Sequence, residues 1–144
     1  MEYVYHGSKI QGLKKLKTRS GTHRQEWVYA TPSKAVALIF ISNRGWDLNY
    51  RIDGNGTKEK PLILTERKPG MFDEIYNISG SLYTLKGNNF KSGRTSWNAE
   101  VVSEFEEEIV KEEQIDNILE KIVELSEKVN SYLTVIQKDQ QICL

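Results

Sequence analysis

The chain has 144 residues, of which 38% are hydrophobic and 28% charged, so it fits one globular domain and is too short for two of ordinary size. No apolar run approaches the roughly 20 residues needed to cross a bilayer, and the acidic start Met1-Glu2-Tyr3 lacks the basic segment of a secretory signal. The single cysteine, Cys143, excludes an internal disulfide and a cysteine zinc site. We therefore expect a cytoplasmic, single-domain protein that lies in no membrane.

The net charge of zero conceals a division along the chain. Residues 1–99 contain 16 lysines and arginines and 8 acidic residues, whereas residues 100–144 contain 4 and 12. A basic surface attracts the phosphates of nucleic acids or dinucleotides, but the acidic segment could equally pair with it inside the molecule. The densest basic run, from Lys14 to Arg19, contains no aromatic residue on which a base could stack, so nucleic-acid binding is only weakly supported.

In the first third of the chain, the pattern predicts two short strands and one helix. Residues 2–5 form the first expected strand, which ends at His6-Gly7-Ser8, and residues 27–30 form the second. Thr31 is a good N-cap residue and Pro32 suits the first position of a helix. We expect a buried helix to begin there and to end near Ser42.

The middle of the chain reads mainly as strands. Asp53-Gly54-Asn55-Gly56 tolerates positive φ and separates two strand patterns, which predicts a hairpin. The segment that starts at Trp46 alternates apolar and polar side chains, as a half-buried strand does. The expected strands cover residues 46–52, 61–65, 75–78, 81–85 and 100–105. Many strands with one early helix favour an α+β fold over a parallel βαβ series.

The last third predicts an amphipathic helix. Apolar residues recur at steps of three or four positions from Ile115 to Ile136, with acidic residues on the other side. An unbroken helix from about Glu112 to Gln137 would be roughly 40 Å long. It would either bend around the body or meet a partner, which leaves a homodimer through this helix open. We accordingly divide the chain into a body, residues 1–110, and a helical C-terminal extension, residues 111–144.

Three residues that could carry chemistry lie at strand ends in this scheme. His6 follows the first strand, Tyr29 ends the second, and Glu100 opens a late strand. Taken singly, each has a structural explanation: a surface histidine, a core tyrosine and one solvated carboxylate among many. Side chains at strand ends can converge from distant parts of a chain, so their order and context carry more information than each residue alone.

In that order and context the chain resembles the ADP-ribosyltransferase superfamily, in the His-Tyr-Glu branch that includes the poly(ADP-ribose) polymerase catalytic domain. The likeness lies in Tyr5-His6-Gly7-Ser8, in the strand and helix start from Val28 to Ala35, and in Asn98-Ala99-Glu100-Val101-Val102. It spans about residues 3–110. It implies a split antiparallel β-sandwich of that superfamily, here with one early helix and an amphipathic C-terminal helix, and it implies NAD as a substrate without a metal.

The resemblance also implies a role for each site residue. His6 would hydrogen-bond the adenosine-side ribose of NAD, the Gly7 backbone would hold the nicotinamide amide, and Tyr29 would stack on the nicotinamide ring. Glu100 would bind the nicotinamide ribose, stabilise the positive charge that develops as the glycosidic bond breaks, and help to deprotonate an acceptor. The other candidate NAD-binding residues are Ser8, Ser33 and Phe40, the last in place of the family's second stacking tyrosine.

The resemblance favours a mono-ADP-ribosyltransferase or an NAD glycohydrolase, because the chain has little room for the loops of a chain-forming polymerase. An RNA 2′-phosphotransferase would need more arginines and histidines around a phosphate than His6 and His23 provide. A non-catalytic module of the same fold that binds a nucleotide or a protein, and a nucleic-acid binder acting through residues 14–19, are the remaining alternatives. The acceptor is unidentified, and loops 44–46, 71–76 and 87–97 are expected to select it.

Overall fold

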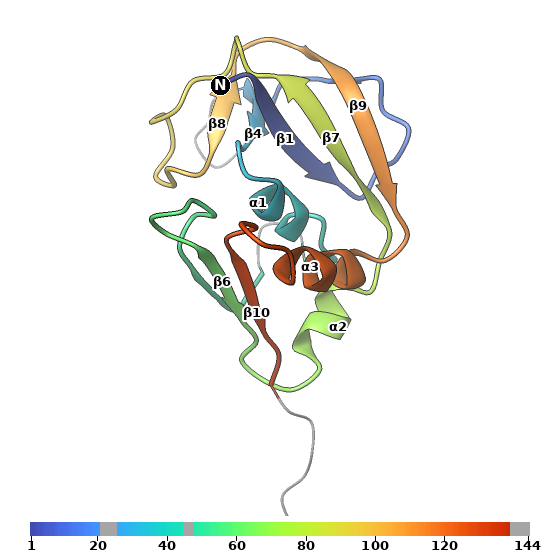
Figure 1. Cartoon of the computed structure of the whole chain (residues 1–144). Helices are drawn as coiled ribbons and strands as arrows, with labels where there is room; N and C mark the ends of the chain where they lie inside the picture. The colour runs from blue at the N-terminus through green and yellow to red at the C-terminus, as the bar shows by residue number, and fades with distance from the viewer. Residues whose placement is uncertain (21–25, 45–47, 139–144) are drawn as a thin grey trace, which may run out of the picture.

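The structure is a computed structural model that describes residues 1–20, 26–44 and 48–138, and it shows an α+β protein built mostly from strands (Figure 1). The strands are β1 (Tyr3–Ser8), β2 (Lys15–Leu16), β3 (Arg19–Ser20), β4 (Glu26–Ala30), β5 (Arg51–Asp53), β6 (Leu62–Thr65), β7 (Gly80–Lys86), β8 (Val101–Ser103), β9 (Glu107–Ile115) and β10 (Leu133–Ile136). The helices are α1 (Lys34–Ile39), α2 (Met71–Tyr76) and α3 (Ile118–Ser126). His23, Trp46 and Cys143 lie outside the described residues.

The strands form three sheets, with the orders β1-β7-β9-β2, β3-β4-β8 and β10-β6-β5. The first two sheets are antiparallel, whereas β10 runs parallel to β6 in the third. Two backbone hydrogen bonds join Tyr5 of β1 to Thr31, which follows β4, with N···O distances of 2.7 and 2.9 Å. The end of the second sheet is thereby fixed against the middle of β1.

Buried apolar side chains form two clusters. The helical core contains the buried apolar side chains of α1, α2 and α3 together with Leu62 and Leu64 of β6, and it occupies the lower part of Figure 1. The sheet core lies between strands of the first two sheets and consists of Val4, Leu16, Val28, Ala30, Leu85, Phe90 and Val101. Helix α1 lies between the two regions in Figure 1 and places its C-terminal half near β1.

The N-terminal elements differ from the sequence expectation in their limits. Strand β1 continues through His6 and Gly7 to Ser8 instead of ending at residue 5. The N-cap of α1 is Ser33, whose Oγ accepts a hydrogen bond from the N–H of Val36, and the helix ends at Ile39. Thr31 does not cap the helix because its backbone is committed to the bridge with Tyr5.

In the middle of the chain the predicted hairpin is confirmed and one predicted strand is wrong. Strands β5 and β6 pair antiparallel around a turn in which Gly54 and Gly56 have φ of 80° and 83°. Residues 46 and 47 of the predicted strand lie outside the described residues; from residue 48 onward the strand covers residues 51–53, after Asn49 with a φ of 54°. Residues 75–78 contain the end of α2 instead of a strand, and β7 pairs with β1 and β9.

The expected C-terminal helix is replaced by a strand, a shorter helix and a second strand. Strand β9 runs to Ile115, α3 covers nine residues, and β10 pairs with β6. The apolar residues of this segment therefore face the core from three elements, and positive φ at Asn130 and Tyr132 accompanies the change of direction before β10. The division at residue 110 falls inside β9, and α3 packs on α1, α2 and β10. None of the described helices has the length and apolar character that a bilayer span requires.

Candidate functional site

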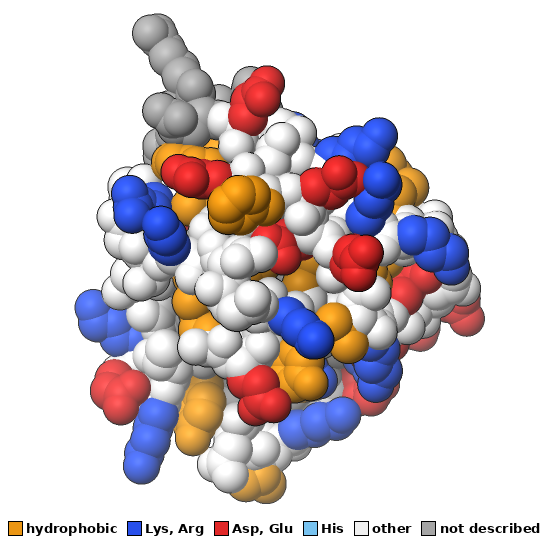
Figure 2. All heavy atoms as spheres, turned by 90° about the horizontal axis from the view of Figure 1, so that it is seen from above, with side chains coloured by type: hydrophobic (Ala, Val, Ile, Leu, Met, Phe, Trp, Pro, Cys, Tyr) orange, Lys and Arg blue, Asp and Glu red, His pale blue; other side chains and the backbone are white. Residues whose placement is uncertain are grey.

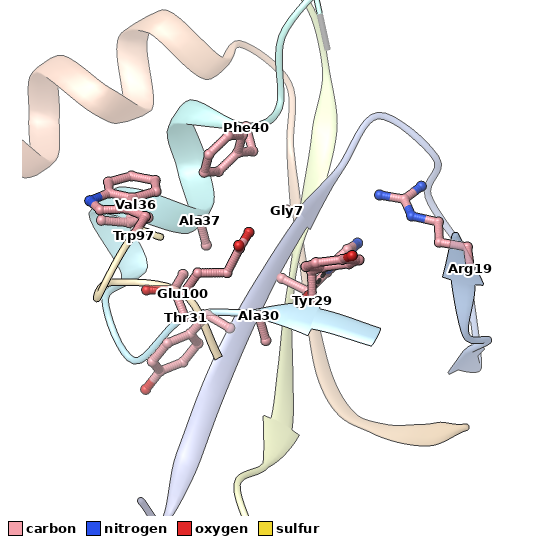
Figure 3. Close-up of a pocket in the computed structure, with 12 residues that line it drawn as sticks. Gly7, Arg19, Tyr29, Ala30, Thr31, Val36, Ala37, Phe40, Trp97 and Glu100 are labelled. Atoms are coloured by element: carbon pink, nitrogen blue, oxygen red, sulfur yellow. Dashed lines mark hydrogen bonds between the residues drawn. The ribbon is translucent and has the colours of Figure 1, made fainter. Parts of the chain in front are cut away.

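A cavity of about 200 Å³ lies where β1, β4, α1 and the segment before β8 meet (Figure 3). His6, Tyr29 and Glu100 all line it, although they are separated by up to 94 positions in the chain. Gly7 and Phe40, two of the other candidate NAD-binding residues, line it as well. The structure thus brings together most of the residues that the sequence singled out.

Strand pairing explains why these residues converge. The bridge between Tyr5 and Thr31 places His6 beside the C-terminal end of β4. On the other side of β4, Tyr29 is the register partner of Val102 and Ala30 that of Val101. Glu100 directly precedes β8, so the antiparallel register brings it to the same end of β4.

His6 is held by the backbone of β4. Its Nδ1 lies 2.7 Å from the carbonyl oxygen of Tyr29. Because a carbonyl can only accept, Nδ1 carries the proton and Nε2 of the neutral ring is left as an acceptor. Burial lowers the pKa of His6 below 6.5, against the opposing effect of the Tyr29 carbonyl, and the charge of Arg19 lowers it further. The ring is therefore neutral at physiological pH, with one defined tautomer.

Tyr29 and Glu100 influence each other electrostatically. Burial, and after it the carboxylate of Glu100, raise the pKa of the Tyr29 hydroxyl. The phenol consequently stays neutral at physiological pH, while the edge of its ring meets Trp27 at a centroid distance of 6.0 Å. Figure 3 shows the Glu100 carboxylate extending into the space between Tyr29 and Phe40. A negative charge thus lies among aromatic rings in a partly enclosed space.

Trp97 is a lining residue that sequence reasoning treated only as the end of a loop. Its indole meets the ring of Phe40 edge to face, with centroids 5.8 Å apart and planes at 64°. Both rings line the cavity, opposite the strand that carries Tyr29. The cavity therefore has a second aromatic wall, supplied partly by a residue outside the motif pattern.

Arg19 is a charged lining residue that the sequence analysis did not assign to this site. It belongs to β3, where it is the register partner of Trp27. It lines the cavity together with His6 and Tyr29. Its charge helps to lower the pKa of His6 and opposes the rise in the pKa of Tyr29. A guanidinium at the edge of the cavity can attract an anionic group of a ligand.

Gly7 is required by packing as well as by its place in the cavity. A Cβ at this position would lie 2.1 Å from the carbonyl oxygen of Ala37 and 2.7 Å from Cγ1 of Ile41. Helix α1 and the residues that follow it therefore approach the backbone of β1 directly. This close approach brings Phe40 of the α1 C-cap to the cavity.

Ser8 and Ser33 do not lie in this cavity, in contrast to the sequence expectation. The hydroxyl of Ser8 accepts a hydrogen bond from the N–H of Ile10, and Ser8 lines a neighbouring cavity. Ser33 is engaged as the N-cap of α1. Both residues were expected near the ligand because of the resemblance to the ADP-ribosyltransferase motifs.

Chemically, the cavity offers flat aromatic walls, a neutral histidine with a free acceptor nitrogen, a carboxylate and a nearby guanidinium. Within the described ranges, no three His, Cys, Asp or Glu side chains are grouped so that they could hold a metal ion. Comparison of the chain with protein-family models, with curated proteins and with solved structures finds no match, so its function has to be argued from the cavity.

Proposed function

We propose that this cavity binds the nicotinamide end of NAD and that the protein is an enzyme of the ADP-ribosyltransferase type, which transfers ADP-ribose to an acceptor or to water. The observation that carries the proposal is the meeting of His6, Tyr29 and Glu100 in one cavity. On this proposal, the first two sheets correspond to the split β-sandwich of that superfamily.

The walls of the cavity suit a flat heterocycle. Tyr29 on one side, and Phe40 with Trp97 on the other, present aromatic surface to the space between them. Aromatic contacts of this kind contribute about 1 kcal/mol beyond burial of area. Pockets for drug-sized ligands measure roughly 300–1,000 Å³, so a cavity of about 200 Å³ holds the nicotinamide and its ribose, and not the whole dinucleotide.

The ribose on the adenosine side would meet His6 at the edge of the cavity. The bond from Nδ1–H to the Tyr29 carbonyl fixes the ring and leaves Nε2 to accept a hydrogen bond from a ribose hydroxyl. The lowered pKa keeps this nitrogen unprotonated at neutral pH. The geometry of β1 and β4 therefore orients the acceptor before NAD binds, which reduces the entropic cost of binding.

Glu100 would act on the bond that breaks. The bond between C1′ and the nicotinamide nitrogen breaks, and its electron pair leaves with nicotinamide. An oxygen of the acceptor or of water then supplies the electron pair of the new C1′–O bond and loses its proton. The Glu100 carboxylate stabilises the positive charge that develops on the ribose, and it can accept that proton.

The test compares the wild type with Glu100→Gln and with Glu127→Gln, which removes an exposed carboxylate of the α3 C-cap. We expect wild type and Glu127→Gln to release nicotinamide from NAD, and Glu100→Gln to release it about a hundredfold more slowly. All three should be stabilised against melting by NAD. Melting shifts without nicotinamide release from any of them would identify a non-catalytic NAD-binding module. Neither release nor a melting shift would reject the proposal.

A further inference from the structure

Two further cavities lie beyond Tyr29 along the second sheet and share Trp27 as a wall. The larger, of about 280 Å³, meets the NAD cavity at His6, Arg19 and Tyr29, and the smaller measures about 90 Å³. We call the two cavities the basic tract, because Trp27 stands among five cations that line them: Lys15, Lys17, Arg19, Lys91 and Arg94.

Glu104 and Glu106, which lie between β8 and β9, compensate part of the charge of the tract. Lys15 is paired with Glu106, with Nζ and Oε1 2.8 Å apart, and Glu104 is the acidic residue that lines the smaller cavity. The other four cations of the tract are exposed and form no ion pair with any part of the chain that the structure describes. Cations on both sides of one aromatic residue are the arrangement that attracts a chain of phosphates.

Trp27 supplies the aromatic surface that the basic run lacks in the sequence. The pairing of β3 with β4 makes Arg19 and Trp27 register partners, so a cation and an indole lie side by side although they are eight positions apart. Tyr29 contacts the Trp27 ring edge to face and supports its position. Phe105, 59% exposed, adds a second aromatic side chain to the smaller cavity. A base can therefore stack between phosphate-binding cations.

We propose that the basic tract binds single-stranded nucleic acid, with a base stacked on Trp27 and its flanking phosphates held by Lys17 and Arg19 on one side and by Lys91 and Arg94 on the other. In a single strand the face of a base is accessible to an aromatic side chain, whereas in a duplex it is stacked against the neighbouring bases. Figure 2 shows acidic and basic side chains interspersed over one face of the molecule. The binding does not depend on the proposed NAD chemistry.

The first experiment measures fluorescence anisotropy of labelled 12-mers of deoxythymidine and of uridine, and of a 12-base-pair duplex, with the full-length chain and without NAD. We expect at least one single strand to bind more tightly than the duplex, and the two 12-mers distinguish DNA from RNA. With four phosphate contacts, affinity should fall roughly 50-fold between 50 and 200 mM salt. Absence of binding, tighter binding of the duplex, or affinity independent of salt would overturn the proposal.

The second experiment compares two double variants that remove the same charge. Lys17→Gln/Arg94→Gln takes one cation from each cavity, and Lys58→Gln/Lys60→Gln takes two exposed lysines from the β5–β6 turn. The tract variant should bind about tenfold more weakly with a shallower salt dependence, and the control should bind like the wild type. Equal losses in both would show that general charge, and not the tract, is responsible, and would reject the proposal.

Trp27→Leu tests the stacking directly, with an expected loss of affinity of roughly tenfold. If this variant also melts earlier, because it removes the contact with Tyr29, the two charge variants decide the outcome. Nicotinamide release by the same preparations is measured separately. Loss of nucleic-acid binding and absence of nicotinamide release are therefore distinguishable results.

Discussion

The helical core and the sheet core are built in different ways. In the helical core, aromatic side chains interlock: Phe72 lies 4.9 Å from Tyr50 and 6.2 Å from Tyr76 between ring centroids, and the two tyrosine hydroxyls are 2.6 Å apart. In the sheet core, smaller side chains fill the space between strands that backbone hydrogen bonds already hold. The cavity lined by His6, Tyr29 and Glu100 lies at their boundary, where α1 faces β4.

Because of this difference, we expect the stability of the protein and the shape of the cavity to depend on different residues. Side-chain packing in the helical core is expected to supply much of the stability, because close-packed interiors lose transfer and cavity energy together when a large side chain is removed. The residues at the boundary are positioned mainly by strand register and by the close approach of α1 to β1. Substitutions there should alter the cavity more than the free energy of unfolding.

The largest effect is expected from Phe72→Ala, compared with Phe90→Ala in the sheet core. Both side chains are buried, at 1% and 5% exposure. Loss of Phe72 should lower the free energy of unfolding by about 3–5 kcal/mol. Loss of Phe90 should lower it less, because Phe90 lies in the segment between β7 and β8 and has no ring partner among the described residues. Urea unfolding measures both. An equal or greater loss for Phe90→Ala would remove the distinction between the two regions.

A smaller loss of stability with a larger effect on the cavity is expected from Gly7→Ala. The new methyl group would press on the Ala37 carbonyl and on Ile41, so α1 must move away from β1. Overpacking of this kind costs about 1–3 kcal/mol. Because Phe40 and Ala37 move with α1, the thermal shift caused by NAD should disappear while the protein remains folded. If NAD still raised the melting temperature of the variant, the position of α1 would not be important for NAD binding.

Local sequence signals predicted those elements whose cause is local. The Gly-rich hairpin turn, strand β4 and the presence of α1 follow from turn chemistry, β-branched and aromatic runs, and capping residues. Helix α2 was missed because its N-cap, Gly70, has no capping side chain. The N–H of Phe72 instead donates to the buried carboxylate of Glu66, six positions earlier, which also accepts from the N–H of Lys138. The tail was predicted as one helix because its periodicity does not reveal the parallel pairing of β10 with β6.

The sequence predicted the motif residues of the candidate site, but it did not predict the other residues that line the cavity. His6, Tyr29 and Glu100 stood out because they occur in order at strand edges, and the structure brings them into one cavity. Trp97 and Arg19 reach the same cavity through a loop and through the pairing of β3 with β4, which no local pattern encodes. Ser8 and Ser33 were named because of the motif resemblance, and in the structure one lines a neighbouring cavity and the other caps α1.

The smallest effect, and the one that tests the boundary most directly, concerns the pH dependence of His6. Its pKa is lowered in the folded protein, chiefly by burial, whereas the unfolded chain retains a value near 6.5. Between these two values the unfolded state binds the proton first, so the contribution of His6 to stability is complete above pH 6.5 and is lost as the pH falls toward the folded-state pKa.

His6→Gln removes this titration. We therefore expect the difference in free energy of unfolding between wild type and variant to shrink by up to about 1.4 kcal/mol from pH 7.5 to pH 5.5, the limit for a group that stays neutral in the folded state one pH unit below its unfolded pKa. Urea unfolding at the two pH values measures it, and the comparison cancels the carboxylates common to both proteins. A difference that stays constant would mean that His6 has the same pKa in the folded protein as in the unfolded chain. In that case Nε2 would not be held neutral by its position between β1 and β4, and the role of His6 as an acceptor for a ribose hydroxyl would lose its physical basis.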